Sequence, residues 1–458
     1  MSAPWLLALL MSSATTTSTA AAAKRPSGSN DAIIRGTPLT LVRAVQAALR
    51  TEPLVASARL ARDRSRLAHL RAQLDRFSLR VDAQLQELWF KTGIGGGRDD
   101  AGEGGLGLSN VSARLDVPLF SGLRVESNVR RTEHLDHAAR YDLAEERRSA
   151  ALAVARAYWS VRRLSLLRRV EVKAVERLVD AETTAVSRVR SGIAPPIDAN
   201  RAKARRLLQE VAVGDLDGTL QVEAGRLATL LGLSEEVRLV DAPVSARPSP
   251  PALEILLEEA RAERPGVLAA RARLGAQDQA VDMALSGYYP QLSGFVLYQH
   301  GNNPALAGAN SSAVFASTNP FRNLAGDLQL GVVLSINLFD TLNTYTDVED
   351  ARLEASRRAK DVERAGRVVE TDVRVARAEV VRLLALIERL EGVRALADDN
   401  LTINRRRYEG GEAQVFELLD SEIELVDVER RLIEATVELT VAWLELDASL
   451  GMVVGEEA

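Results

Sequence analysis

The stretch Asp327-Leu-Gln-Leu-Gly-Val-Val-Leu-Ser-Ile-Asn-Leu338 decides the fold, because every even position in it is apolar. A period of two puts alternate residues on opposite faces of a β-strand. Residues 110–119, Asn-Val-Ser-Ala-Arg-Leu-Asp-Val-Pro-Leu, alternate in the same way. One face of each strand is therefore apolar and the other polar, which is the pattern of a β-sheet that separates lipid from water.

The strands come as two pairs, about 79–120 and 291–339, with loops rich in Gly, Asn and Ser at 93–109 and 299–326. Four strands are too few to close a barrel, since closure needs about eight or more. An open sheet edge cannot lie in hydrocarbon, because its backbone groups would have no partners. If these strands span a membrane, several copies of the chain must share one barrel.

The chain is internally duplicated. Thr37-Pro38 and Ser249-Pro250 each read as a helix start and lie 212 positions apart. After the strands the separation becomes 219, which aligns Arg188 and Gly192 with Arg407 and Gly411. Each copy therefore reads helix, strand, strand, long helix, turn and return helix.

Heptad-like spacing of apolar residues marks the helices. We expect them at about 37–76, 122–190 and 196–232 in the first copy, and at about 250–286, 341–409 and 413–451 in the second. The seams follow steps of three and four, as in Val373, Ala376, Val380 and Leu383, which is the pattern of antiparallel coiled-coil packing. A helix of about 70 residues spans roughly 100 Å. We predict a tall wall of helices with the strand pairs at one end and the helix turns at the other.

The predicted organisation has five parts. Residues 1–23 read as an export signal, with an apolar run near Trp5 and small residues before Lys24, although no basic residue precedes the run. An Ala/Thr-rich disordered tail is the alternative. The first repeat then covers 24–232, a linker 233–249, the second repeat 250–451 and a C-terminal tail 452–458.

Composition excludes several functions. The net charge of -5 argues against a nucleic-acid partner, which needs a basic face. The chain has no cysteine, which excludes disulfides, thiolate catalysis and cysteine metal sites. No later segment offers about 18 uncharged apolar residues, so no transmembrane helix is expected.

Both helix turns place acids at the start of the return helix, namely Asp198 in the first copy and Glu417 and Asp420 in the second. Acids there complement the helix dipole, by about 0.3–1 kcal/mol each. They could also form a ring of negative charge where several copies converge on an axis. Sequence leaves both interpretations open.

Several short motifs occur in order and nearly twice over. They are Leu39-Thr40-Leu41 with Glu52-Pro53, Val117-Pro118-Leu119-Phe120, Tyr289-Pro290-Gln291-Leu292, the Arg188–Gly192 and Arg407–Gly411 turns, and Leu446-x-x-x-Leu450-Gly451. On these motifs the chain resembles the TolC family of outer-membrane efflux proteins over nearly its whole mature length.

The resemblance implies a mostly α fold with membrane β-structure: a homotrimer whose four strands per chain form a 12-stranded outer-membrane barrel above a helical tunnel through the periplasm. No nucleophile–base motif is visible in the sequence, so we expect neither enzyme activity nor a cofactor. The partners would be a periplasmic adaptor (membrane fusion) protein, an inner-membrane pump and outer-membrane lipid.

The resemblance also assigns site residues. Those matching the family's periplasmic gate are Asp198, Tyr408, Glu417 and Asp420. Those matching the adaptor-docking tip are Ser191, Gly192, Ile193, Ala194, Pro195, Glu409, Gly410, Gly411 and Glu412. The chain departs from the family in having Ala413 where a basic residue is usual, Glu417 where aspartate is usual, and Pro195-Pro196 at the first turn.

Other constellations are weaker. The glycine clusters at 93–97 and 102–107 lack the Lys-Ser/Thr of a nucleotide loop, so flexible loops are the better interpretation. His134 and His137 lack a third metal ligand. Aromatic residues near the strand ends fit either interfacial girdles or ordinary packing: Trp89, Phe90, Phe120, Tyr288 and Tyr289. The function predicted is a passive export channel, and the alternative is a structural or adhesive coiled-coil protein of the cell surface.

Overall fold

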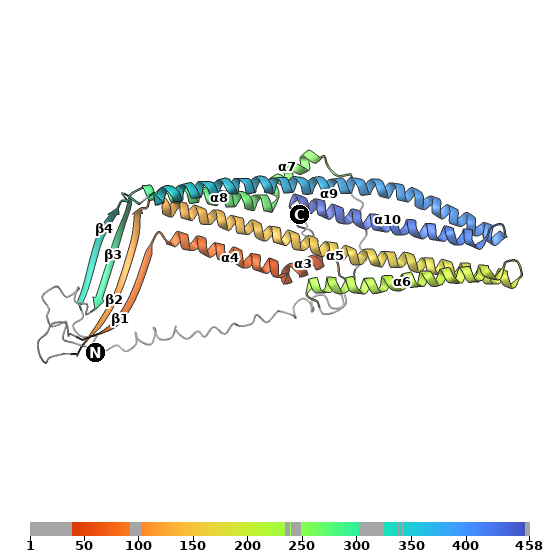
Figure 1. Cartoon of the computed structure of the whole chain (residues 1–458), viewed down its shortest axis with the longest axis horizontal. Helices are drawn as coiled ribbons and strands as arrows, with labels where there is room; N and C mark the ends of the chain where they lie inside the picture. The colour runs from red at the N-terminus through yellow and green to blue at the C-terminus, as the bar shows by residue number, and fades with distance from the viewer. Residues whose placement is uncertain are drawn as a thin grey trace.

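The computed structural model describes residues 39–91, 103–233, 239, 249–301, 325–337, 339–340 and 342–453. Side chains of residues 84–91, 103–110, 301 and 325 lie outside this description. The proposed signal 1–23 and most of the linker and tail also fall outside it. Within it, four strands lie at one end of a long bundle of helices and two helix turns lie at the other (Figure 1).

The four strands form one antiparallel sheet in the order β1-β2-β3-β4. They are β1 (Ser78–Lys91), β2 (Glu103–Phe120), β3 (Gln291–Gly301) and β4 (Ala325–Ser335). Residues 103–109, 299–301 and 325–326, expected in loops, are therefore strand, because the ladders extend further than the apolar alternation indicated. β4 ends at Ser335, before the expected boundary at 339.

The register gives the sheet two different faces. Residues paired across an antiparallel ladder share a face, so the pairs Val81 with Ala113 and Val296 with Leu330 belong to an apolar face. Leu79, Val81, Leu330 and Val332 on that face are each at least 65% exposed. The other face carries Arg80, Arg114 and Gln329. The alternation predicted from sequence is confirmed, and the apolar face has no cover within the described chain.

Two helices replace the single opening helix expected in each copy. They are α3 (Leu41–Thr51) and α4 (Pro53–Leu74) in the first copy, and α7 (Leu253–Glu263) and α8 (Pro265–Leu285) in the second. The residues before the prolines, Glu52 and Arg264, have extended backbones with ψ of 119° and 122°. The proline ring excludes the helical conformation from the preceding residue, so both helices break there. The expected start at Ser249-Pro250 is also wrong, since α7 begins at Leu253.

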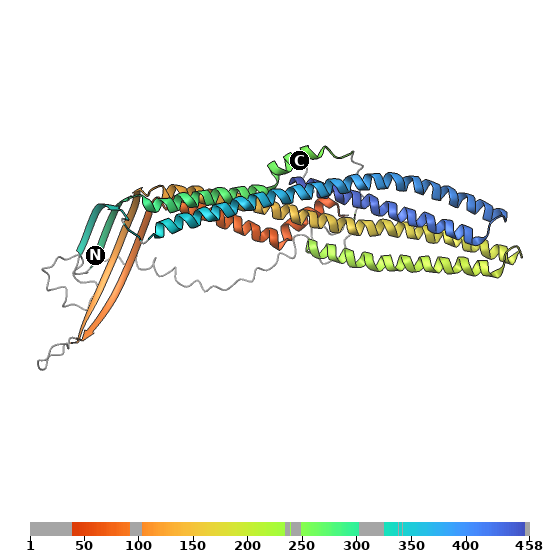
Figure 2. The same cartoon turned by 45° about the horizontal axis from the view of Figure 1, so that its top comes forward.

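The long helices match their predicted lengths. They are α5 (Arg124–Arg190) with its return helix α6 (Pro196–Leu231), and α9 (Asn343–Gly410) with α10 (Val415–Leu450). Helix α5 packs on α4, α6, α8 and α10, and α9 packs on α8 and α10. Figures 1 and 2 show the resulting wall, with α4 and α6 along one side and α9 along the other.

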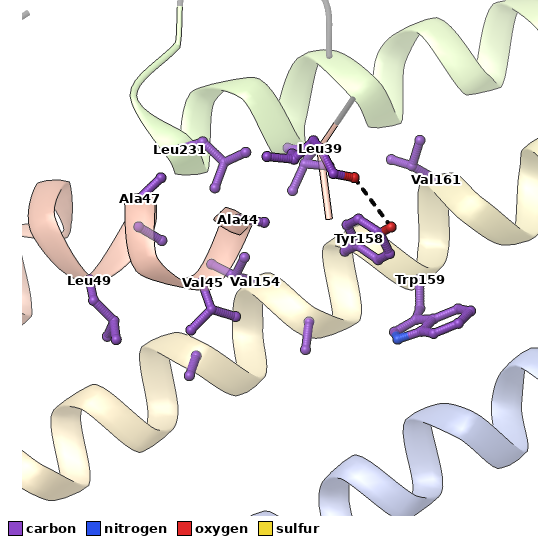
Figure 3. Packing of buried hydrophobic residues seen from close by; sticks show 14 of the residues in the cluster. Leu39, Ala44, Val45, Ala47, Leu49, Val154, Tyr158, Trp159, Val161 and Leu231 are labelled. Carbon is purple, nitrogen blue, oxygen red and sulfur yellow. Dashed lines mark hydrogen bonds between the residues drawn. The ribbon is translucent and has the colours of Figure 1, made fainter. Parts of the chain in front are cut away.

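The predicted heptad seams are the core. The seam residues Val373, Val380 and Leu383 of α9 are fully buried, against α10 and α7. Each such leucine or valine contributes about 1.5–3 kcal/mol by leaving water. A matching cluster in the first copy packs α3 onto α5, where the Tyr158 hydroxyl donates a 3.4 Å hydrogen bond to the Leu39 carbonyl (Figure 3).

Candidate functional site

Both helix turns lie at the end of the wall away from the sheet. Helix α5 ends at Arg190 and α9 at Gly410, and in each turn a glycine with positive φ follows, Gly192 at 76° and Gly411 at 85°. The chain beyond each glycine returns a hydrogen bond to the helix, from Ile193 N to Arg188 O at 3.0 Å and from Glu412 N to Arg407 O at 2.8 Å. This is a Schellman ending, which satisfies carbonyls that the helix leaves open. The predicted turns are confirmed.

The turns present an exposed surface. All nine predicted tip residues except Ala194 are exposed, and Ala194 is half-buried. Ile193 is 67% exposed although it is a large apolar side chain. Pro195 and Pro196 open α6, with Pro196 at its first position, as the sequence predicts.

The three predicted acids lie in different surroundings. Asp198 is in the first turn of α6 and Glu417 in the first turn of α10, where both complement the helix dipole. Glu417 accepts a hydrogen bond from Arg407 Nη1 at 3.3 Å. Asp420 is exposed, and within the described residues it forms no ion pair. Asp198 and Glu417 therefore complement the dipole of their own helix, whether or not they also contribute to a gate.

Tyr408, the fourth predicted gate residue, is 2% exposed and lies in an apolar tip core. That core joins both hairpins through Leu178, Ala181, Ala185, Ala202, Ala397, Leu401, Ala413, Val415, Leu418, Leu419 and Leu425. Burial raises the pKa of the Tyr408 phenol, Arg188 opposes the rise, and the negative charge of Asp198 adds to it. No hydrogen bond joins Asp198 to the Tyr408 hydroxyl in the described structure.

Arg188 is a site residue that sequence reasoning did not assign. Its guanidinium lies over the Tyr408 ring, 4.6 Å from the centroid, and its Nη1 donates to the Tyr408 carbonyl. The turn motif Arg188–Gly192 was visible in the sequence, but nothing local indicated that Arg188 reaches the other hairpin. This contact joins α5 to α9 at the tip.

Two turns of helix further in, a buried acid joins three helices. Glu422 of α10 is 2% exposed and accepts hydrogen bonds from Arg177 Nε of α5 at 2.6 Å and Arg405 Nη2 of α9 at 2.9 Å. Beside it, Ser421 accepts from the Asn404 amide at 2.6 Å. Removal of one member of such a buried ionic group is strongly destabilising, because its partners are left without a counter-charge.

The weaker candidates from the sequence are the histidine pair, the glycine clusters and the aromatic residues near the strand ends. Among the residues that the structure describes, no group of three His, Asp or Glu side chains could hold a metal ion. His134 instead packs against Gly275 of α8. Most of residues 93–109 lies outside the described chain, as do the side chains of Trp89 and Phe90. Phe120, Tyr288 and Tyr289 are 45–56% exposed where strands meet helices, so they are not packed in the core of the described chain.

No helix in the described chain is both long and apolar enough to cross a membrane. Comparison with known protein families identifies the family of this chain. The family described as "Outer membrane efflux protein" matches residues 44–233 and 256–452, which is more than half of the sequence. The chain belongs to the outer membrane efflux protein family. The two matched segments follow the two halves of the wall. The family consists of outer-membrane transport proteins rather than enzymes.

Individual relatives agree. The outer membrane protein TolC of Vibrio cholerae is 25% identical over 198 residues, which is 43% of this chain and 43% of TolC. The alignment thus spans less than half of that relative. The structure of VceC from Vibrio cholerae matches with a TM-score of 0.71 at 19% identity, over 90% of this chain and 96% of VceC.

Two further structures share the fold. CusC, studied for transmembrane channel formation, matches with a TM-score of 0.73 at 15% identity, over 90% of this chain and 91% of CusC. The open-state outer membrane channel MtrE of Neisseria gonorrhoeae matches with a TM-score of 0.71 at 17% identity, over 90% of this chain and 88% of MtrE. The predicted fold class and the predicted family are confirmed.

Proposed function

We propose that this chain is a passive outer-membrane channel-tunnel of a tripartite export system. The observation that carries the proposal is the sheet, which exposes an apolar face and leaves the outer edges of β1 and β4 without a neighbouring strand in the described structure. Neither feature is stable in a monomer, since lipid must cover the face and another strand must pair each edge.

Three copies satisfy both requirements. Two copies would supply eight strands, and a barrel of about eight is filled by its own side chains. Three copies supply twelve, the smallest multiple that leaves a lumen lined by the polar face. A head-to-tail contact of β4 with β1 of the next copy closes such a ring by rotation.

The helices favour the same contact. Helix α4 exposes Leu60, Leu67 and Leu74 at steps of seven, each more than 60% exposed. On the opposite side of the wall α9 exposes Val368 and Val375, and further along Leu396 and Ile403, also at steps of seven. A stripe with this spacing fits a neighbouring helix in a coiled coil. We infer that α9 of one copy packs on α4 and α6 of the next.

At the tip we propose the gate and the docking surface. Three copies would bring the acids Asp198, Glu417 and Asp420 around the axis as a cation-selective ring. Tyr408, which is buried in the tip core, would belong to the gate through its ring and backbone and would not line the axis. The exposed turns, 191–195 and 409–412, would contact the periplasmic adaptor, which links the tunnel to an inner-membrane pump. Energy would come from that pump, since a passive duct supplies only the path.

We also propose the chain organisation predicted from sequence: an export signal at 1–23, repeats at 24–232 and 250–451, the linker 233–249 and the tail 452–458. The elements α3 to α6 and α7 to α10, with two strands each, follow the same order and support the two repeats.

Conductance of the purified mature chain tests the proposal. Detergent-solubilised protein should have the mass of a trimer and should form ion-conducting pores in a planar bilayer. A matched variant lacking the turn 191–195 should still assemble and reach the outer membrane but lose export in cells. A water-soluble monomer without conductance would refute the channel and favour a coiled-coil surface protein.

A further inference from the structure

The two copies place an arginine at the same position of each turn, yet the two arginines make different contacts. Arg188 precedes Gly192 by the same interval at which Arg407 precedes Gly411. Arg407 pairs with Glu417 of its own hairpin, with Nη1 and Oε2 3.3 Å apart. Arg188 instead reaches across to Tyr408 of the other hairpin.

The matching acids differ in the same way. Asp198 follows Gly192 at the interval at which Glu417 follows Gly411. Glu417 is paired with its arginine, whereas within the described chain Asp198 forms no ion pair. The first hairpin therefore has a suitable acid of its own, and its arginine is nevertheless directed to the second hairpin.

The contact with Tyr408 uses the ring face and the backbone. The guanidinium lies 4.6 Å from the ring centroid and donates to the Tyr408 carbonyl, in the last turn of α9, where helix carbonyls carry partial negative charge. A Cβ atom built on Gly411 would lie 3.5 Å from Arg188 Nη2, so the turn passes close to the guanidinium. The Tyr408 hydroxyl, by contrast, is buried and has no hydrogen-bond partner in the described structure.

The second hairpin has no cation of its own at this place. Ala413, where a basic residue would otherwise stand, is 8% exposed and belongs to the apolar tip core, next to the fully buried Val415. The only cation over the Tyr408 ring in the described structure therefore comes from α5.

We propose that Arg188 is the latch of the gate: it holds the two hairpins of one chain together through the ring face and the carbonyl of Tyr408, and the hydroxyl takes no part. The inference rests on the proposed channel function. Opening of the tip would separate the α9–α10 hairpin from α5 at the turns, and the Arg188–Tyr408 contact there would have to break. The other bond described between α5 and this hairpin, from Arg177 to Glu422, lies further from the turns. Arg188 is a positioning residue and need not touch the exported solute.

Single-channel recording of the full mature chain in planar bilayers tests the latch. The variants are Arg188→Ala, Arg188→Gln, Arg188→Lys and Tyr408→Phe, with Arg407→Ala as the matched control from the other copy. We expect Arg188→Ala and Arg188→Gln to raise the open fraction about tenfold, the change that 1.4 kcal/mol produces. Arg188→Lys should give a smaller rise, because an ammonium cannot stack as a planar guanidinium does.

Tyr408→Phe and Arg407→Ala should leave the open fraction within about twofold of the parent, since neither removes the stacked guanidinium. Sedimentation and the helix signal of each variant establish that it is assembled and folded, and Arg188→Gln serves if the alanine variant does not fold. A parent-like open fraction for both Arg188→Ala and Arg188→Gln would overturn the latch. So would opening by Tyr408→Phe, which would assign the link to the hydroxyl, or equal opening by Arg407→Ala, which would show a general charge effect. If the parent chain does not conduct at all, the channel function fails instead.

Discussion

Replacement of Glu422 by alanine tests how much a buried charge stabilises the packing of α5, α9 and α10 near the turns. The carboxylate is 2% exposed and is bonded to Arg177 at 2.6 Å and to Arg405 at 2.9 Å. Removing one member of a buried ionic group costs about 3–5 kcal/mol, because its partners stay desolvated and unpaired. Here the arginine side chains are 21% and 41% exposed, so water stabilises part of their charge. The expected loss is about 2–3 kcal/mol.

Thermal unfolding of the detergent-solubilised protein, followed by the helix signal, measures that loss. We expect Glu422→Ala to lower the midpoint by about 2–3 °C, because the unfolding entropy of 458 residues is about 1 kcal/mol per degree. Glu422→Gln should lose less, because the amide keeps one acceptor. The matched control is Glu363→Ala, which removes exposed ion pairs with Lys360 and Arg367. The three side chains are 49–81% exposed, so the change should not be measurable.

Replacing Glu422 and Arg177 together with leucine should restore part of the midpoint, since it removes the less exposed of the two arginine charges that Glu422→Ala leaves unpaired, while Arg405 remains. A Glu422→Ala midpoint equal to the parent would refute the reasoning, because it would mean that the arginines find water or other partners without cost.

Three further outcomes are expected. Leu330→Arg, on the apolar face of the sheet, should cost about 2–4 kcal/mol of stability in lipid and reduce outer-membrane yield, whereas Gln329→Arg on the polar face should assemble normally; equal yields would contradict the assignment of faces. Gly122→Ala should destabilise the fold by about 2 kcal/mol and so lower the unfolding midpoint, because φ is +60° and the added Cβ would lie 2.8 Å from Tyr289 Cβ. An unchanged midpoint would show that the turn relaxes without cost. Burial raises the pKa of Glu171 in the folded state, so its stabilising contribution is complete at low pH and is lost as pH rises through that pKa. Glu171 also pairs with Arg430 and accepts a hydrogen bond from Gln209, so the test is the pH dependence of the change. Relative to the parent, Glu171→Gln should have a higher midpoint at pH 7 than at about pH 4, and a difference that is independent of pH would count against this account.

Several features of the fold could be read from local pattern. The alternation at Leu328–Ser335 and Val111–Leu115 specifies which face of each strand is apolar, because a one-residue slip would turn every side chain to the wrong side. The heptad steps at Val373 and Val380 specify the buried stripe of α9. Gly192 and Gly411 mark the turns, since only glycine accepts their positive φ at low cost.

The helix breaks show where the sequence was informative but was interpreted too simply. Pro53 and Pro265 lie 212 positions apart, the same separation as the two helix starts, and each also ends the preceding helix. The rule is local, because the proline ring restricts the residue before it. The expectation of a single helix over 37–76 and over 250–286 did not apply that rule to the two prolines.

The sequence by itself determined the alternating strands, the helical seams, the turns and the family, because each follows from neighbours at most a few residues apart or from motifs in order. Only the tertiary structure decided the partners of Arg188, Arg407 and Glu422. Arg188 and Arg407 occupy equivalent positions in the two turns, and each has an acid at the same spacing. Their contacts differ because a long side chain takes its partner from whatever helix packs beside it, and that neighbour is set by the whole wall.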